Sequence, residues 1–273
     1  MQWNISENFS NNSAYNELLM SSSGVSGVDA DVVSVSVMEG DSVTLHTDDK
    51  TNQQEYVKWY FDDIRIAQIT GDLSYICTDV QCNEGTERFR DRLKLDHQTG
   101  SLTIMNITNT DSGLYHLEII SSSSISEKIF SVAVHGVSAA ERDKMKRKSV
   151  KEGESFTLYT GEIKNPNDLK MWYFNDTRIA EITGVACKIC TDVQCEERFR
   201  DRLKLDHQTG SLTIMNTRTT DSGLYHLQIN SSRFSITRSF SINVTGEYNL
   251  VISIEKYSNS SAFYYYLLLL FSL

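Results

Sequence analysis

The chain has 273 residues, of which 40% are hydrophobic and 23% are charged, as in an ordinary globular protein. This length suits one large domain or two domains of about 100 to 120 residues. The formal net charge of −10 leaves little basic surface for phosphate backbones, so we expect no nucleic-acid partner. A single proline excludes a collagen-like stalk or a Pro-rich linker.

The start of the chain, residues 1–28, is polar and is expected to be disordered. It has neither the basic n-region nor the long apolar h-region of a signal peptide. Short alternating runs then predict strands, in chain order, at 42–47, 56–61, 64–70, 93–95, 102–104, 114–120 and 129–134. His97–Gly100 reads as a hairpin turn. No run keeps a helical period, so seven to nine short strands in about 100 residues predict an antiparallel β-sandwich.

The chain then repeats itself. Residues 87–106 recur unchanged as residues 197–216, and Trp59-Tyr60-Phe61 recurs as Trp172-Tyr173-Phe174. Two copies of about 100 residues predict tandem domains rather than a solenoid, whose repeats span about 20–50 residues. The predicted boundaries are domain 1 at 29–136, a polar linker at 137–148, domain 2 at 149–246, and a stalk with an apolar tail at 247–273.

A set of residues in both copies resembles the pattern of V-type immunoglobulin domains. In the first copy it comprises Gly40-Asp41-Ser42-Val43-Thr44-Leu45, Trp59, Arg92-Leu93 and Asp111-Ser112-Gly113-Leu114-Tyr115. The match covers roughly 200 of the 273 residues. The resemblance implies an all-β fold of two tandem immunoglobulin-like (V-type) antiparallel β-sandwiches.

The resemblance also assigns structural roles in each sandwich. A tryptophan fills the space between the sheets, a tyrosine forms the corner before strand F, and an Arg–Asp ion pair closes the base. We prefer Arg92 and Arg202 to Arg88 and Arg198 as the arginines because they immediately precede an alternating strand. The predicted core residues are Trp59, Tyr115, Leu117, Trp172, Tyr225 and Leu227, and the predicted pairs are Arg92–Asp111 and Arg202–Asp221.

The chain departs from this pattern at the disulfide that usually joins strands B and F. The expected cysteine positions hold Thr47 and Leu117 in domain 1 and Thr160 and Leu227 in domain 2. A disulfide closing a loop of about 70 residues would contribute roughly 4 kcal/mol on the chain-entropy model. Burial of a leucine opposite the tryptophan recovers about 2 kcal/mol of that loss.

The five cysteines lie instead in two short segments. Cys77 and Cys82 enclose four residues, and Cys190 and Cys195 enclose the same four, so we predict one local disulfide in each domain. Free thiols are the alternative, whereas a zinc site would need four ligands that these segments do not supply. Cys187 is predicted to be unpaired or intermolecular, and a Cys77–Cys187 bond would overturn the two-loop prediction.

The missing B–F disulfide and the stretch FRDRLKLDHQTGSLTI together resemble the membrane-distal domain of the signalling lymphocyte activation molecule (SLAM) family. That resemblance implies a leukocyte surface receptor or ligand that binds its partner through one sheet face. In that family the second domain is usually C2-type with disulfides, whereas both copies here are V-like and lack the core disulfide.

No catalytic, cofactor-binding or metal-binding constellation is apparent, so we expect no enzyme activity, no cofactor and no metal. Asp111, Ser112 and His116 do not indicate a catalytic triad because the tyrosine-corner motif explains them. V-type domains commonly bind partners with the face formed by strands G, F, C and C′. Strand alternation points the predicted partner-binding residues outward on this face, with solvated strand positions as the alternative. They are Lys58, Tyr60, Arg65, His116 and Glu118.

The two domains differ in charge. Residues 29–136 contain 18 acidic and 8 basic residues, a net −10, whereas residues 149–246 contain 12 of each, a net zero. We therefore expect the partner to be another cell-surface protein, of the immunoglobulin superfamily, with a basic face. A contact between unlike domains of two copies is the alternative, because repulsion disfavours homophilic contact through domain 1 alone.

Eight N-x-Ser/Thr sequons favour a secreted or surface context, and those at Asn106, Asn175, Asn230 and Asn243 are the predicted glycosylation sites. The apolar tail, residues 262–273, is shorter than the roughly 20 residues of a spanning helix. A truncated transmembrane segment, a GPI signal and a gene-prediction artefact stay open. We expect a glycoprotein at the extracellular face of the plasma membrane, attached through its C terminus, that acts in adhesion or immune recognition. A secreted binding or decoy protein without an anchor is the alternative.

Overall fold

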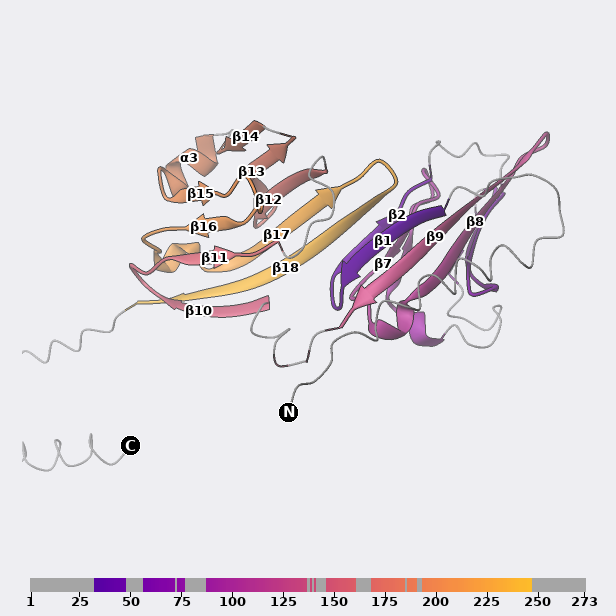
Figure 1. Cartoon of the computed structure of the whole chain (residues 1–273), viewed down its shortest axis with the longest axis horizontal. Coiled ribbons are helices and arrows are strands. Elements are labelled where there is room, and N and C mark those ends of the chain that lie inside the picture. The colour runs from indigo at the N-terminus through magenta and orange to yellow at the C-terminus, as the bar shows by residue number, and fades with distance from the viewer. Residues whose placement is uncertain are drawn as a thin grey trace, which may run out of the picture. The chain divides into compact units, whose positions relative to one another are not determined.

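The computed structural model describes residues 32–47, 56–71, 73–76, 87–136, 138, 140, 146–160, 168–184, 186–190 and 193–246. The chain divides into two compact units, residues 1–137 with 231–236 and residues 138–230 with 237–273. Each unit is a pair of largely antiparallel sheets (Figure 1). Two tandem immunoglobulin-like β-sandwiches result, which confirms the predicted fold class.

In the first unit, the larger sheet has the strand order β1-β9-β8-β3-β4-β5, and β1 runs parallel to β9. Its strands are β1 (Val32–Met38), β3 (Tyr56–Phe61), β4 (Ile64–Thr70), β5 (Leu73–Ile76), β8 (Gly113–Ile120) and β9 (Ile125–His135). The opposing sheet has the order β2-β7-β6, formed by β2 (Ser42–Leu45), β7 (Leu102–Ile104) and β6 (Leu93–Leu95).

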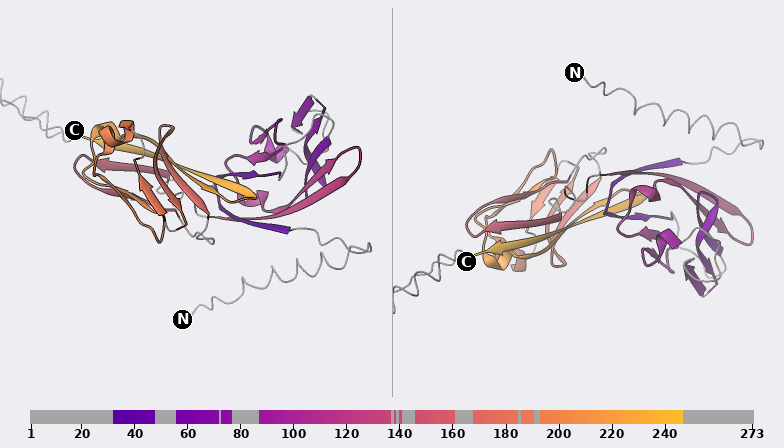
Figure 2. Two further views of the ribbon diagram at one scale, coloured as in Figure 1. Left: turned by 90° about the horizontal axis from the view of Figure 1, so that it is seen from above. Right: turned by 90° about the horizontal axis from the view of Figure 1, so that it is seen from below.

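The second unit repeats this plan. Its larger sheet has the order β14-β13-β12-β17-β18, and β10 runs parallel to β18 on the far side. Its strands are β10 (Arg147–Lys151), β12 (Leu169–Phe174), β13 (Thr177–Thr183), β14 (Ala186–Ile189), β17 (Gly223–Asn230) and β18 (Phe234–Thr245). The opposing sheet is β11 (Phe156–Leu158), β16 (Leu212–Ile214) and β15 (Leu203–Leu205). Figure 2 gives two further views of these strands.

Three of the predicted strands, 56–61, 64–70 and 102–104, coincide with β3, β4 and β7, and β6 also has its predicted bounds. The predicted strand 42–47 ends two residues early, and β9 begins at Ile125 rather than 129. The short helices were not predicted. They are η1 (Glu87–Phe89), η2 (Asn109–Asp111), α3 (Val193–Phe199) and η3 (Thr219–Asp221).

The predicted domain boundaries remain predictions, with two local differences. Strand β10 begins at Arg147, inside the predicted linker 137–148. Residues 231–236, which the prediction assigned to domain 2, group with the first unit.

The core of each sandwich is built around a tryptophan on the central strand of the larger sheet. Trp59 and Trp172 are both 0% exposed, and their rings lie 5.7 Å from Phe130 and 5.6 Å from Phe240 respectively. Strand alternation directs these residues inward, because β3 and β12 show a strict buried–half-buried alternation through the tryptophan. The equivalent contacts show that the two cores are packed alike.

A hydrogen-bonded turn lies beside each tryptophan, next to the position of the missing disulfide. Trp59 Nε1 donates to the carbonyl of Gly100 at 2.8 Å, and Thr47 Oγ1 donates to the neighbouring carbonyl of Thr99. Gly100 has a φ of 74°, a left-handed conformation that favours glycine. The threonine at the strand-B cysteine position therefore connects the end of β2 to the turn between β6 and β7 by a hydrogen bond.

The second domain repeats this arrangement. Trp172 Nε1 donates to the carbonyl of Gly210 at 2.9 Å, and Thr160 Oγ1 donates to that of Thr209 at 2.5 Å. The two turns belong to the block that recurs unchanged between the copies. We call each group of tryptophan, threonine and turn the turn clasp.

The base of each sandwich holds a tyrosine corner and a bidentate ion pair. Tyr115 Oη donates to the carbonyl of Asp111 at 2.9 Å, as Tyr225 Oη does to that of Asp221. Burial raises the pKa of Tyr225, so its hydroxyl stays protonated as a donor. The structure pairs the preferred arginines with these aspartates, at 2.6 Å for both Arg92–Asp111 and Arg202–Asp221.

The competing arginines bind backbone instead. Arg88 Nη1 donates to the carbonyl of Thr110 at 3.0 Å, and Arg198 Nη2 donates to that of Thr220. Each base therefore uses two arginines, one for the aspartate and one for the 3₁₀ turn that carries it.

Candidate functional site

Four of the five predicted partner-binding residues form one connected group on the larger sheet of the first domain. Lys58 lies directly across from Glu118, and Tyr60 from His116, because β3 and β8 pair in that register. Lys58 Nζ lies 3.1 Å from Glu118 Oε2, and Tyr60 Oη donates to the same oxygen at 3.3 Å. The carboxylate of Glu118 thus fixes two neighbouring side chains on an accessible sheet face.

Aromatic stacking extends this group across the strands. The Tyr60 and His116 rings are stacked at a centroid distance of 5.8 Å and an interplanar angle of 27°. His116 Nε2 lies 3.7 Å from Glu127 Oε2 on the next strand, β9. Arg65, the fifth predicted residue, lies across from Tyr60 on β4 and is half-buried. We call Lys58, Tyr60, Arg65, His116, Glu118 and Glu127 the polar face of domain 1.

Glu127 was missed in the sequence because the predicted strand began only at residue 129. The β9 strand begins at Ile125, which places Glu127 across from Glu118. Phe130 and Val132 mark inward positions, and extending this two-residue period backwards along the chain places Lys128 inward and Glu127 outward, which is the signal that would have found it.

A row of apolar side chains, interrupted by Thr70, borders the polar face at the end of the sheet. Leu73 pairs with Thr70, Thr70 with Tyr56, Tyr56 with Ile120, and Ile120 with Ile125, so the row crosses β5, β4, β3, β8 and β9. Three of its members are well exposed: Tyr56 at 47%, Leu73 at 58% and Ile125 at 64%. Exposed apolar side chains that gather at one end of a sheet face are a feature of interaction surfaces.

The second domain keeps the aromatic pair and, in Arg178, the arginine across from the tyrosine, but it lacks the Lys–Glu pair beside them. Tyr173 and His226 stack at 4.7 Å and 12°, and burial lowers the pKa of His226. Tyr173 Oη contacts the sulfur of Met171 at 3.4 Å, where Lys58 stands in the first copy, and Gln228 replaces Glu118. The two faces therefore share a shape at their centre and differ in their polar partners.

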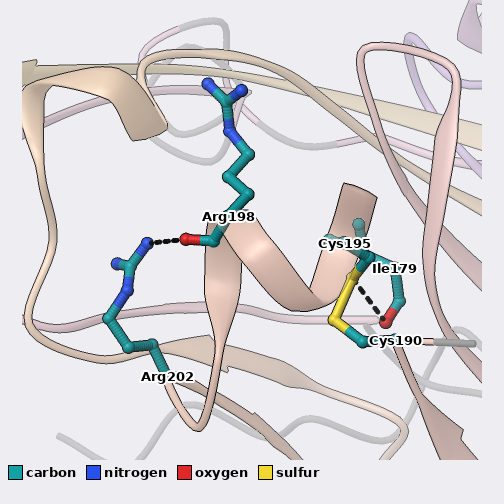
Figure 3. Close-up of a disulfide and its surroundings, with 5 residues drawn as sticks. All are labelled: Ile179, Cys190, Cys195, Arg198 and Arg202. Carbon is teal, nitrogen blue, oxygen red and sulfur yellow. Dashed lines mark hydrogen bonds between the residues drawn. A yellow bond between two sulfur atoms is a disulfide. The ribbon is translucent and has the colours of Figure 1, made fainter. Parts of the chain in front are cut away.

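The predicted edge disulfide is present in the second domain. Cys190, directly after β14, is bonded to Cys195 in α3 (Figure 3). The Cys195 sulfur lies 3.9 Å from the carbonyl oxygen of Ile179, which places the bond against β13. Cys187 is an exposed free cysteine on β14. The predicted Cys77–Cys82 pair lies outside the described residues.

Replacing both Cys190 and Cys195 with serine should destabilise the second domain by about 2 kcal/mol at most, because the bond closes a short loop. The loss should be local, and protection of α3 amides from hydrogen exchange should fall more than that of β17. Equal loss of protection in α3 and β17 would contradict a local role. Cys187→Ser is the matched control and should leave both unchanged.

The described residues contain no group of three or more His, Cys, Asp or Glu side chains arranged to hold a metal ion. Among the helices that the structure describes, none is long and apolar enough to cross a membrane.

Residues 32–135 match the family model of the immunoglobulin V-set domain. The search of curated proteins finds no match. The first domain is therefore an immunoglobulin V-set domain, and the chain carries two immunoglobulin-like sandwiches. This class of domain generally serves recognition and adhesion, and it is typically a non-enzymatic binding module.

Solved structures similar to this chain include three immunoglobulin-type proteins. The first immunoglobulin-like domain of human CD48 antigen is 21% identical over 41% of this chain and 88% of its own, with a TM-score of 0.34. Murine CEACAM1b is 17% identical over 78% and 99%, with a TM-score of 0.29. The titin I-band fragment I67–I69 is 18% identical over 80% and 65%, with a TM-score of 0.26.

Proposed function

We propose that this protein is an extracellular recognition protein that binds another cell-surface protein through the polar face of domain 1, in cell adhesion or immune receptor–ligand binding. The observation that carries the proposal is the joined arrangement on that face. A Tyr–His stack and a Lys–Glu–Tyr group lie beside an exposed apolar row. Such a combination of aromatic anchor, apolar contact and polar rim is what protein–protein interfaces use.

The ordering of the face before binding supports this proposal. Tyr60 has its ring held by His116 and its hydroxyl held by Glu118, so binding costs it little side-chain entropy. A preordered tyrosine is a suitable centre for a binding hot spot. The neighbouring Lys58–Glu118 pair offers one cation and one anion, so the face favours a partner that presents both signs of charge.

We also propose that long-range charge guides the encounter. Residues 29–136 carry a net −10, so a partner with a basic face would be steered toward domain 1 at low salt. The proposed partner is an immunoglobulin-superfamily protein, and the resemblance of residues 89–104 to the SLAM-family D–E hairpin supports a relationship with that family. Attachment to the plasma membrane through the C-terminal segment and N-glycosylation belong to the same proposal.

Tyr60→Ala should weaken binding of the full chain to partner-bearing cells by about 30-fold, the loss of a hot-spot side chain worth about 2 kcal/mol. Titration of purified chain over a panel of leukocyte and epithelial lines, read by flow cytometry, would measure this. Tyr173→Ala, the same change on the second domain, should leave cell binding unchanged. Equal affinity of wild type and Tyr60→Ala, or equal losses from both substitutions, would contradict the proposal.

A further inference from the structure

The sequons within the second domain lie on its larger sheet. Asn230 is the last residue of β17 and Asn243 lies near the end of β18, on the neighbouring strand. Buried Leu227 and Ile229 alternate with Asn230, and buried Ile242 and Val244 flank Asn243. Both asparagines therefore point to the outer surface of the sheet, which is also the surface that carries the Tyr173–His226 stack.

The two asparagines flank this stack from opposite ends. Asn230 lies four residues beyond His226 along β17, which corresponds to about 13 Å along the strand. On β18, Ser239 is the counterpart of Ile129, which pairs with His116 in the first copy, and Asn243 lies four residues past Ser239. Asn243 is exposed and Asn230 is partly exposed, so both amide groups face outward on the sheet surface that carries the stack.

A third sequon lies at the edge of the same sheet. Asn175 opens the turn between β12 and β13, one residue after Phe174 and two after Tyr173. It is exposed, and its side-chain oxygen accepts a hydrogen bond from the Leu224 amide at 3.0 Å, which leaves the amide nitrogen as the glycan-bearing atom.

The first domain differs at each of these positions. The counterparts of Asn175, Asn230 and Asn243 are Asp62, Ile120 and Ala133, none of which can carry an N-glycan. Instead Ile120 belongs to the exposed apolar row of the first domain.

The described sequon of the first domain lies elsewhere. Asn106 follows β7, a strand of the opposing sheet, and it is exposed. Its counterpart in the second copy, Asn216, is not a sequon because Arg218 stands where Thr108 stands in the first. Among the described residues, the sequon of the first domain therefore lies beside the smaller sheet, whereas Asn230 and Asn243 of the second domain lie on the larger sheet.

We propose that N-glycans on Asn230 and Asn243 cover the Tyr173–His226 face of the second domain, so that of the two similar faces only that of the first is open to a protein partner. This inference rests on the proposed function, because sequons are used only on an extracellular chain. A glycan is bulky and hydrated, and two of them on either side of a stack exclude a protein surface of standard size.

Shielding would also explain why two similar aromatic centres are compatible with one specific binding site. The duplicated stack offers a second copy of the same anchor, and an open second copy would compete for ligand or join chains through the wrong domain. Blocking an unwanted site is a recognised means of achieving specificity.

The first test is direct glycopeptide mapping of the full chain secreted from mammalian cells behind an exogenous signal peptide. Most molecules should carry glycan at Asn230 and at Asn243. Finding either site empty in most molecules would overturn the proposal. This measurement requires no knowledge of the partner, so its failure is distinct from failure of the proposed function.

The second test measures shielding with antibody fragments selected on the enzymatically deglycosylated chain. A fragment that no longer binds the Tyr173→Ala variant reports on the face of the second domain. A fragment that no longer binds the Tyr60→Ala variant reports on the face of the first domain. The fragment for the second face should bind the glycosylated chain at least about tenfold more weakly, and an Asn230→Gln, Asn243→Gln double variant should restore its affinity. Equal binding with and without glycans would overturn the proposal.

The chain offers a matched transplant. Ile120 is followed by Ser121 and Ser122, so Ile120→Asn creates a sequon at the position equivalent to Asn230. A glycan at this position should weaken binding of the antibody fragment that recognises the first face by at least about tenfold. Enzymatic deglycosylation should restore that binding. Ile120→Gln, which adds no sequon, is the control. If the Ile120→Asn chain carries the glycan yet binds as tightly as the control, a glycan at this position does not shield and the proposal fails.

Discussion

Replacing Arg202 with methionine is expected to lower the free energy of unfolding of the second domain by about 3–5 kcal/mol, because it leaves a buried carboxylate without its cation. Asp221 is 0% exposed, and Arg202 holds both of its oxygens, at 2.6 and 2.9 Å. Methionine keeps the aliphatic stem and removes the charge and all five donors.

Arg202 also connects the base of the sandwich to two other segments. Its guanidinium donates to the carbonyl of Arg198 at 2.8 Å, shown in Figure 3, and to that of Asn216 at 3.1 Å. The Arg198 carbonyl lies in the last turn of α3 and the Asn216 carbonyl lies just after β16, so a single side chain joins both segments to the tyrosine corner. Removal of the charge should therefore affect the cooperativity of the whole domain.

Chemical denaturation with hydrogen exchange read separately in β17 and β8 would assign the loss to one domain. Arg92→Met is the matched variant in the first domain. The Arg92 side chain is 18% exposed against 8% for Arg202, so the first domain should lose less. Arg202→Lys should fall between, since it keeps charge without the bidentate geometry. A loss below about 1 kcal/mol for Arg202→Met would contradict the prediction, because the Arg202–Asp221 pair would then contribute no more than an exposed salt bridge.

The framework of the fold followed from sequence because its parts are fixed by local patterns. The tryptophan lies within an alternating aromatic strand, and the tyrosine lies four residues after its hydrogen-bond acceptor, Asp111. The arginine of the ion pair is identified by its position immediately before an alternating strand. Each of these residues can be placed without knowing how distant strands align.

The binding face was only partly predictable because it depends on strand register. Outward positions follow from alternation, but a register shift between Trp59 and Tyr60 decides that Arg65 lies across from Tyr60. The apolar row needs the same knowledge for five strands at once. No pattern in the sequence indicates which outward residues from different strands become neighbours.

The role of the threonines was likewise hidden. Thr47 and Thr160 occupy the usual cysteine positions, and the sequence alone shows only that these positions lack a disulfide. Each in fact donates its hydroxyl to a turn about 50 residues away in sequence, 52 for Thr47 and 49 for Thr160. The compensation for a missing disulfide is therefore not only apolar burial but also a polar contact that joins strand B to the D–E turn.

Replacing Trp172 with alanine should cost the second domain about 3–5 kcal/mol, because it removes a fully buried ring and opens a cavity between the sheets. Trp172→Phe separates the contribution of ring packing from that of the hydrogen bond, since it keeps an aromatic ring and removes the Nε1–H donor. The carbonyl of Gly210 would then be buried without its partner, at a cost of about 1–3 kcal/mol.

The geometry of the turn clasp predicts that the hydrogen bonds of Trp172 and Thr160 stabilise the domain cooperatively. The carbonyls that accept from Trp172 and Thr160 belong to adjacent residues, so losing one bond should loosen the turn that presents the other. A double-mutant cycle of Trp172→Phe and Thr160→Val should therefore show a coupling energy of about 0.5–3 kcal/mol. Urea unfolding, read by hydrogen exchange in β16 and β17, would measure it.

The same cycle in the first domain, Trp59→Phe with Thr47→Val, is the internal comparison and should give coupling of the same sign, because its turn has the same sequence and contacts. Additive losses in both domains would show that the two bonds act independently. The threonine would then be only a small residue that fills the space of the missing sulfur, and these domains would depend on packing alone where others have a covalent bond. Coupling in both would instead show that the four-residue turn contributes part of the stability that the B–F disulfide usually supplies. The turn is held by a tryptophan from the opposing sheet and by a threonine that follows the neighbouring strand of its own sheet.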